Sequence, residues 1–239
     1  MEQSSANLSA ANRPFSAACL PKEEPRVISC NVGRPREIQL RGGAVWTGIF
    51  KFPVEGRVAV GALNLAGDEQ ADLSVHGGRD KAVYLYPSEH YQYWANELPQ
   101  TEMPWGMFGE NLTTKGLDER LLGIGDRLRI GSAFLKVTQP RMPCYKLALK
   151  FGLRDMVARF WNSGRSGVYL SVLDEGELGV RDTIEVIPAP SPSLAIGELL
   201  SFYTGKNPDP EILQRAMRSQ DLPWSWKLAL TERWEETRA

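Results

Sequence analysis

Hydrophobic and polar residues alternate in short segments along most of the chain, and glycine or proline separates these segments. Period-two alternation between such breaks is the pattern of half-buried β-strands. It predicts strands at residues 27–32, 37–40, 44–52, 57–60, 82–86, 133–138 and 168–173. Residues 123–131 and 180–187 share a turn-and-strand pattern that suits two comparable strands of one barrel. Many short, closely spaced strands favour a mainly β fold, a barrel or a sandwich.

A helical period replaces the alternation in a few places. One apolar stripe runs from Leu153 to Trp161 and ends near Gly164, and another carries His90 beside Tyr91 and Trp94. After residues 189–193, which have the composition of a linker, three more helical stripes follow. We therefore expect a barrel domain with peripheral helices at residues 26–188 and a small three-helix domain at 189–239. Residues 1–25, which are rich in Ser, Ala, Asn and Pro, are expected to form a disordered leader.

Composition narrows the class of protein. The 239 residues carry a net charge of −1, which gives no reason to expect general binding to nucleic acid or to an anionic membrane. No apolar run approaches the length of about 18 residues that a membrane-spanning helix needs. Three cysteines without metal-finger spacing favour a reducing, cytoplasmic setting. Two histidines exclude a three-histidine zinc site, and we interpret His90 as a structural or surface helix residue.

The clearest candidate for chemistry is Cys144, which follows a predicted strand and two prolines. The cations Arg141 and Lys146 flank it, and neighbouring cations lower the pKa of a thiol by stabilising the thiolate. The thiolate is the form of cysteine that attacks electrophiles and binds metals. The alternative is an inert, buried cysteine that serves only as a small hydrophobic residue.

Three further segments could contact a ligand. The loop at residues 66–81 concentrates titratable side chains around Gly77 and Gly78, whose backbone can approach a ligand or point N–H groups at an anion. A well-hydrogen-bonded connection between strands, with His76 paired to a carboxylate, explains that loop equally well. Asn111 follows a glycine turn, for which a structural role is the simpler reading. Arg165 and Ser166 could hold a phosphate or could simply be solvated.

Together these segments resemble the MOSC domain, the C-terminal type of domain of molybdenum cofactor sulfurases, and more closely the bacterial YiiM-type proteins. The resemblance runs from about Val27 to the C-terminus. Its most specific motifs lie at residues 75–81, at 109–112, and at 139–147 around Cys144. It implies a MOSC-type β-barrel followed by a three-helix domain. It also implies a molybdenum cofactor, a molybdopterin, with Cys144 as the metal ligand.

By the same resemblance, related proteins reduce N-hydroxylated compounds such as hydroxylaminopurines and amidoximes. The implied partners are such a substrate and an external flavin or haem electron donor, with a homodimer as an option for assembly. The residues implied for the cofactor are Gly77, Gly78, Lys81, Asn111, Arg141, Tyr145, Lys146, Arg165 and Ser166. The implied proton donors are His76, Asp72 and Asp80. Two alternatives stay open: a carrier of sulfur or cofactor that uses Cys144, and an interaction module without catalysis.

Overall fold

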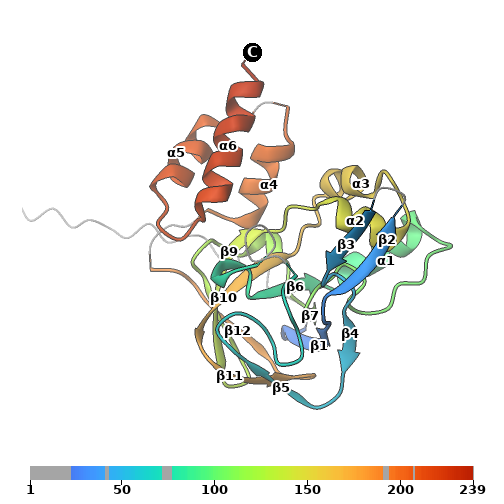
Figure 1. Ribbon diagram of the computed structural model, residues 1–239. Coiled ribbons are helices and arrows are strands. Elements are labelled where there is room, and N and C mark those ends of the chain that lie inside the picture. Colours follow the sequence, from blue (N-terminus) through green and yellow to red (C-terminus); the bar gives the residue numbers. More distant parts are fainter. Residues whose placement is uncertain (1–22, 41–42, 72–76, 191–193, 207, 239) are drawn as a thin grey trace, which may run out of the picture.

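The computed structural model describes residues 23–40, 43–71, 77–190, 194–206 and 208–238. Its largest element is an eight-stranded sheet (Figure 1) with the order β12-β8-β9-β10-β6-β7-β1-β4. Neighbours in this sheet are antiparallel except for β6 and β7, which are parallel. The eight strands are β1 (Arg26–Val32), β4 (Phe52–Val54), β6 (Val83–Pro87), β7 (Leu112–Lys115), β8 (Arg127–Ile130), β9 (Ala133–Pro140), β10 (Val168–Asp174) and β12 (Ile184–Ile187).

Two small two-stranded antiparallel sheets accompany it. The first pairs β2 (Arg36–Leu40) with β3 (Gly43–Thr47), and the second pairs β5 (Arg57–Val60) with β11 (Gly176–Gly179). Alternation in the strands points one set of side chains inward, as in β8, where Leu128 and Ile130 are buried while Arg127 and Arg129 are exposed. Burial of each such Leu or Ile stabilises the fold by about 1.5–3 kcal/mol. The sequence pattern therefore selects the core face of the sheet.

The predicted β-barrel is not confirmed, and the structure shows a curled, sheet-rich fold with several helices. Among the described strands, β12 and β4 end the hydrogen-bonded order of the large sheet and do not pair with each other. The beginning of β1 nevertheless meets the segment before β12. Val27 N–H donates to the Asp182 carbonyl at 3.0 Å, and Ile184 N–H donates to the Pro25 carbonyl at 2.7 Å. The sheet therefore curls round far enough for its β12 end to meet β1, the strand next to β4, without a continuous closing ladder.

Three helices cover one side of the sheet: α1 (Glu89–Glu97), α2 (Tyr145–Phe151) and α3 (Met156–Ser163). Between them and the sheet lies an aromatic cluster built on buried rings such as Tyr86, Trp94 and Phe160. His90 on α1 is buried, and its Nε2 lies 2.7 Å from Oε1 of the buried Glu119. This contact agrees with the structural role predicted for His90.

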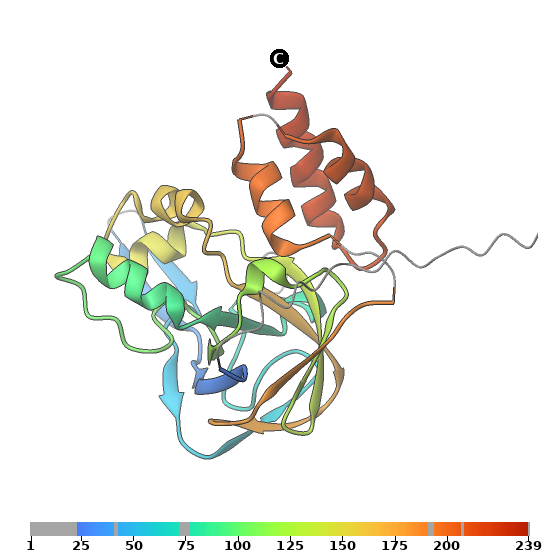
Figure 2. The ribbon, with the colours of Figure 1, turned by 180° about the vertical axis from the view of Figure 1, so that it is seen from behind.

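The last three helices are α4 (Ile196–Thr204), α5 (Pro210–Arg218) and α6 (Trp224–Glu236). They stand together above the sheet in both views (Figures 1 and 2) and are called the three-helix unit below. As predicted, Asp209 caps α5 by accepting a hydrogen bond from the Glu211 N–H at 2.9 Å, and Pro210 is the first helical residue. No helix in the described part of the chain has the length and apolarity needed to cross a membrane.

The structure departs from the sequence-based prediction at three elements. The strand expected at residues 44–52 divides into β3 and β4, because Gly48 packs so closely on the Glu69 carbonyl that a Cβ would lie 2.8 Å from it. Helix α2 and strand β11 were not predicted. Most of the predicted leader, residues 1–22, lies outside the described residues, whereas Glu23 pairs with Arg26 and Lys115.

Candidate functional site

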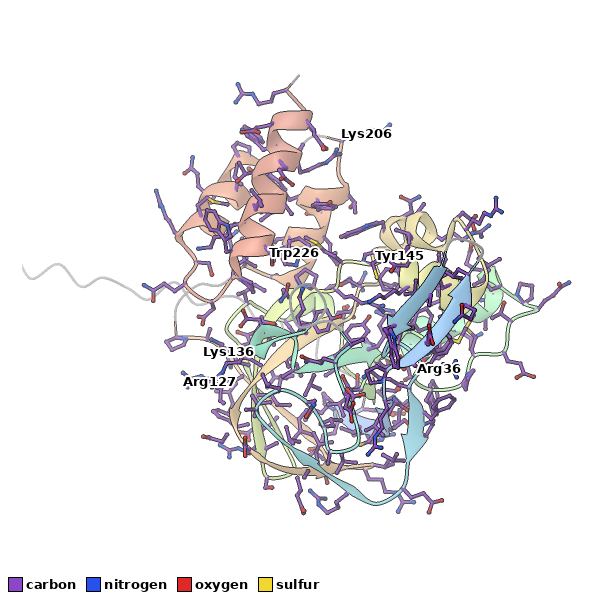
Figure 3. All side chains as sticks on the ribbon, in the orientation of Figure 1. Arg36, Arg127, Lys136, Tyr145, Lys206 and Trp226 are labelled. Carbon is purple, nitrogen blue, oxygen red and sulfur yellow. The ribbon has the colours of Figure 1, made fainter. Side chains whose placement is uncertain are left out.

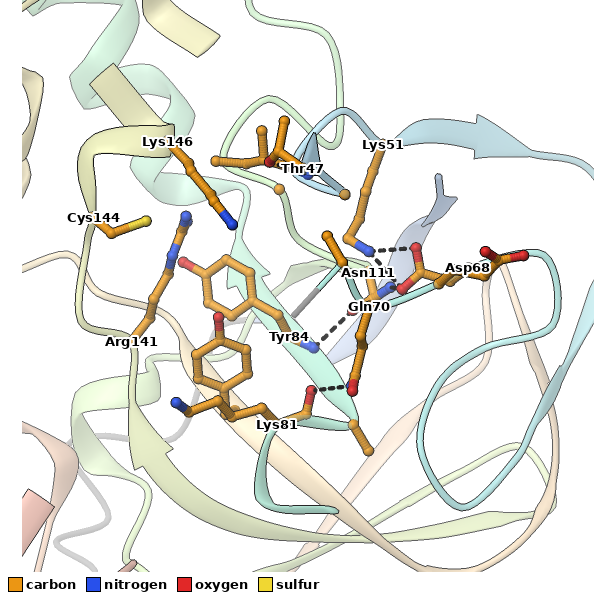
Figure 4. A pocket seen from close by; sticks show the side chains of 17 residues that line it. Thr47, Lys51, Asp68, Gln70, Lys81, Tyr84, Asn111, Arg141, Cys144 and Lys146 are labelled. Atoms are coloured by element: carbon orange, nitrogen blue, oxygen red, sulfur yellow. Dashed lines mark hydrogen bonds and ion pairs between the residues drawn. The ribbon is translucent and has the colours of Figure 1, made fainter. Parts of the chain in front are cut away.

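One open pocket lies where the connection between β3 and β4 faces the end of β9 (Figure 4). Six parts of the chain form its walls: residues 47–51, residues 68–71, residues 81–84 at the start of β6, residues 109–111, the segment that leads from β9 into α2, and Tyr169 of β10. The lining residues are Thr47, Gly48, Ile49, Lys51, Asp68, Glu69, Gln70, Ala71, Lys81, Ala82, Tyr84, Gly109, Asn111, Arg141, Cys144, Lys146 and Tyr169. Segments far apart in sequence therefore meet at one site.

Cys144 lies at this pocket because of the way β9 ends. Residues 140–144, called the cysteine segment below, leave the sheet at Pro140 and reach helix α2 at Tyr145. Each proline of this segment favours an extended conformation of the residue before it. Cys144, which follows Pro143, is also extended, with φ −131° and ψ 173°. Its side chain is half-buried and lines the pocket. The predicted presentation of a thiol at a strand end is therefore what the fold produces.

Arg141 and Lys146 bring two cations to the wall that carries Cys144 (Figure 4). The Arg141 guanidinium is buried, donates to the Phe108 carbonyl and lies 4.8 Å from the centre of the Tyr84 ring. Lys146 is only 9% exposed, and within the described residues its ammonium has no hydrogen-bond or ion-pair partner. Lys146 therefore presents its positive charge to the open pocket, where an anionic ligand could pair with it.

On the opposite wall, Asp68 is the centre of a hydrogen-bonded group. It accepts from Lys51 at 2.5 Å, from Gly33 N–H at 2.9 Å and from Asn111 Nδ2 at 2.8 Å. Burial lowers the pKa of Lys51, and the charge of Asp68 acts against that shift. The Asn111 Oδ1 accepts the Tyr84 N–H at 3.0 Å. Asn111 therefore lines the pocket, with its amide engaged in holding the wall together, and its role toward a cofactor stays a prediction.

The glycine loop reaches the pocket through Lys81. Gln70 holds the loop, because its Oε1 accepts the Gly78 N–H at 2.8 Å and its Nε2 donates to the Lys81 carbonyl at 3.1 Å. Gly78 has φ 91°, a conformation that a glycine adopts without strain. Burial lowers the pKa of Lys81, while Asp80 and Cys144 act in the opposite direction. Gly77 is half-buried and, like Gly78, is absent from the pocket lining.

Several predicted site residues lie elsewhere. Tyr145 is 53% exposed, and Asp80 is exposed on the 3-10 turn Arg79–Lys81; neither lines the pocket. The Arg165 guanidinium lies 3.7 Å from the centre of the Tyr93 ring and donates to the Ser163 carbonyl. Ser166 is buried and donates its hydroxyl to the Gly167 carbonyl. The roles assigned to these four residues stay predictions, as do those of His76 and Asp72, which lie outside the described residues.

Part of the pocket lining was not predicted from the sequence. Tyr84 and Tyr169 face each other across β6 and β10, with ring centres 5.0 Å apart. A tyrosine in an otherwise apolar strand carries a polar tip and could have drawn attention to this position. No sequence pattern near Lys51 or Asp68 predicted a role in the pocket, because their ion pair joins two different segments of the chain.

Charge in the pocket is unevenly distributed. Lys51 is offset by Asp68, whereas Arg141 and Lys146 lie on the side that carries Cys144. Glu69 is the other acidic residue of the lining, and its carboxylate lies 3.5 Å from Arg34. The side around the cysteine thus has an excess of positive charge, which suits an anionic ligand such as a phosphate.

Known proteins of similar sequence and structure show the family of this chain. The model of the MOSC domain family matches residues 72–185. Protein YiiM of Escherichia coli (strain K12) is 37% identical over 187 residues, which are 77% of this chain and 83% of that protein. The crystal structure of YiiM from Geobacillus stearothermophilus superposes with a TM-score of 0.71 at 31% identity, covering 87% of this chain and 98% of that one.

The name of one longer relative states an enzymatic activity. A Gibberella moniliformis (strain M3125 / FGSC 7600) protein named "Reductase" is 33% identical over 191 residues, which are 78% of this chain and 34% of that protein. The similarity thus spans about a third of the fungal protein. From the family match and the extent of similarity to YiiM, the chain belongs to the MOSC domain family and is a relative of the YiiM proteins.

Proposed function

We propose that this protein binds a molybdenum cofactor in the pocket and, as an oxidoreductase, reduces N-hydroxylated compounds of the hydroxylaminopurine and amidoxime type. The observation that carries the proposal is the presence of Cys144 in one pocket with Lys81, Arg141 and Lys146. The MOSC family match and the fungal relative named as a reductase support the same direction.

The residues present fit such a cofactor. A molybdopterin carries a phosphate and a polar ring system, and its metal accepts soft sulfur ligands. The pocket offers a half-buried thiol, a buried cation without a protein partner in the described chain, and two tyrosine rings.

Each wall then has a distinct task. Cys144 would supply the thiolate ligand, and Arg141, Lys146 and Lys81 would offset the charge of the phosphate. The Asp68 hydrogen bonds would keep the facing wall rigid. When bound, the cofactor supplies two-electron redox chemistry at the N–O bond of the substrate. An external flavin or haem protein is the proposed source of the electrons.

The proton required by the departing oxygen needs a donor near the substrate. His76, Asp72 and Asp80 are the proposed candidates. Asp80 is exposed, and its backbone carbonyl accepts a hydrogen bond from the Thr138 hydroxyl at 2.6 Å, which fixes the turn and leaves the carboxyl at the surface. Single substitutions of these three residues to Asn or Gln would show, by their effect on the pH profile of turnover, which of them donates the proton.

The first test is the molybdenum and pterin content of the purified protein, produced in a host that makes the cofactor. Near-stoichiometric metal and pterin are expected in wild type and in Cys30→Ala, which alters a buried cysteine in the sheet core. Cys144→Ala should lose the metal or change its absorption spectrum, because a thiolate ligand is missing. Loaded wild type should then reduce an amidoxime with a chemical electron donor.

Other results would contradict the cofactor proposal or favour one of the alternatives. A folded wild type that contains neither metal nor pterin would overturn the cofactor proposal. A persulfide detected on Cys144 by mass spectrometry of that same sample would favour the sulfur-carrier alternative. An unreactive Cys144 without a persulfide would favour the interaction module.

A further inference from the structure

The three-helix unit touches the cysteine segment directly. Trp226 of α6 is 0% exposed, and its indole Nε1–H donates to the Pro140 carbonyl at 3.1 Å. Figure 3 shows Trp226 at the end of the three-helix unit that faces the sheet. Pro140 is the last residue of β9, and Arg141 and Cys144 follow it. A single side chain of the appended helices therefore holds the start of the segment that carries the thiol.

Aromatic contacts fix the position of that indole. The Tyr203 ring of α4 packs edge-on against Trp226, with centroids 5.9 Å apart, and stacks on Trp161 of α3 with centroids 4.7 Å apart. Trp161 belongs to the helix that covers the sheet, so the contacts run from α6 through α4 to α3. Met142, within the cysteine segment, packs against the apolar cluster that contains Trp226. The segment is thus held through a backbone carbonyl and a side chain.

We infer that the three-helix unit serves as a support for the site, in which Trp226 is a positioning residue that fixes residues 140–144 and so sets the exposure of Cys144. This inference concerns the placement of the thiol and does not depend on whether a molybdenum cofactor is bound. It gives the three-helix unit a positioning role at the site, which the pocket lining alone does not indicate.

The geometry favours this role over that of an ordinary core contact. The chain has no side-chain hydrogen bond from Cys144 to cap helix α2, so the segment is held by its other contacts. The Arg141 guanidinium anchors the segment to the Phe108 carbonyl on one side, and Trp226 anchors Pro140 on the other. The two prolines stiffen the segment, so a shift at either anchor should be passed on to Cys144.

The test is the rate at which iodoacetamide alkylates Cys144 in the full chain, followed by peptide mass spectrometry that resolves each cysteine. Trp226→Phe keeps a ring and removes the N–H. The matched control is Trp224→Phe on the same helix, where the native ring is 73% exposed. Removal of one neutral hydrogen bond shifts a local opening equilibrium by about fivefold, so Cys144 should react about fivefold faster in Trp226→Phe alone.

Melting temperatures are measured on the same samples, and alkylation is carried out well below them. If Trp226→Phe does not fold, Tyr203→Leu takes its place, because it removes the ring that packs on Trp226 and leaves the indole N–H intact. A faster reaction at Cys144 with Cys30 still protected supports the inference, since Cys30 reports global unfolding. Equal rates in the folded variant and in Trp224→Phe would overturn it.

Discussion

At the scale of single residues, Lys150 shows what burial does to a charge beside the pocket. Its Nζ donates to the Ile49 carbonyl at 2.8 Å and to the Gly106 carbonyl at 2.5 Å. Burial lowers the pKa of Lys150 to about 7; the cations Arg141 and Lys51 add to this shift, and Glu110 opposes it. A neutral amine still has two N–H groups, which match the two carbonyls. Lys150 thus joins helix α2 to the pocket wall at Ile49.

This shift makes stability depend on pH in a known direction. The unfolded chain keeps the Lys150 proton up to the ordinary pKa of 10.5, whereas the folded protein releases it above about 7. Between these values the unfolded state binds more protons, so the free energy of unfolding rises with pH, by at most about 1.4 kcal/mol per pH unit. Below pH 7 both states are protonated and this dependence disappears.

Urea denaturation of wild type and Lys150→Met at pH 6, 7, 8 and 9 measures the effect. The free energy of unfolding of wild type, minus that of the variant, should stay level from pH 6 to 7 and increase from 7 to 9. Taking the difference removes the contributions of other titrating groups. A difference that is constant across the whole series would show that Lys150 has an ordinary pKa in the folded protein.

At the scale of elements, the turn that leads into β10 depends on a glycine. Gly167 has φ 62°, and an added Cβ would lie 2.5 Å from the Leu85 carbonyl oxygen on the neighbouring strand β6. Gly152, at the end of α2, has a similar φ of 67° but open space around it. Comparing alanine substitutions at the two positions therefore separates the cost of a left-handed backbone from the cost of a steric clash.

Gly152→Ala should lower the free energy of unfolding by about 1–2 kcal/mol, the cost of a left-handed conformation for an alanine. Gly167→Ala should cost about 1–3 kcal/mol more, because backbone atoms of β6 must also shift. Chemical denaturation of both variants measures the two values. Equal losses at the two sites would mean that the packing of this turn against β6 is looser than the structure shows.

At the scale of the whole molecule, the three-helix unit and the sheet share one core. Leu199 of α4 and Trp226 of α6 belong to the same apolar cluster as Leu135 of β9. Backbone hydrogen bonds cross the boundary too, since Ile124 N–H donates to the Leu194 carbonyl and Ile196 N–H to the Leu122 carbonyl, both at 2.8 Å. The helices after residue 189 and the sheet before it therefore share a common core, and the domain boundary placed there stays a prediction.

We expect this common core to make the full chain unfold in one cooperative transition. Differential scanning calorimetry should give one peak, with a calorimetric enthalpy equal to the van't Hoff enthalpy. The fluorescence of the buried tryptophans should change at the same temperature as circular dichroism at the β-sheet band. Two resolved peaks would indicate that the three-helix unit and the sheet fold independently.

The sequence by itself determined most of the elements. Alternation marked β8 and β9, a 3.6-residue stripe marked α3, and the pair Asp209 and Pro210 marked the start of α5. The reason is that side-chain burial and capping are decided within a few neighbouring residues. The motif at residues 139–147 likewise placed Cys144, Arg141 and Lys146 together, because they are close in sequence and lie on one short segment.

Only the tertiary structure decided which distant residues share the pocket. The pairing of Lys51 with Asp68, the approach of Gly48 to Glu69 and the anchoring of Pro140 by Trp226 each join segments that no local pattern connects. The same holds for Arg165, which stacks on Tyr93 instead of lining the pocket. Such contacts depend on how the curled sheet and its helices pack as a whole, and burial and hydrogen bonding fix them only after the chain has folded.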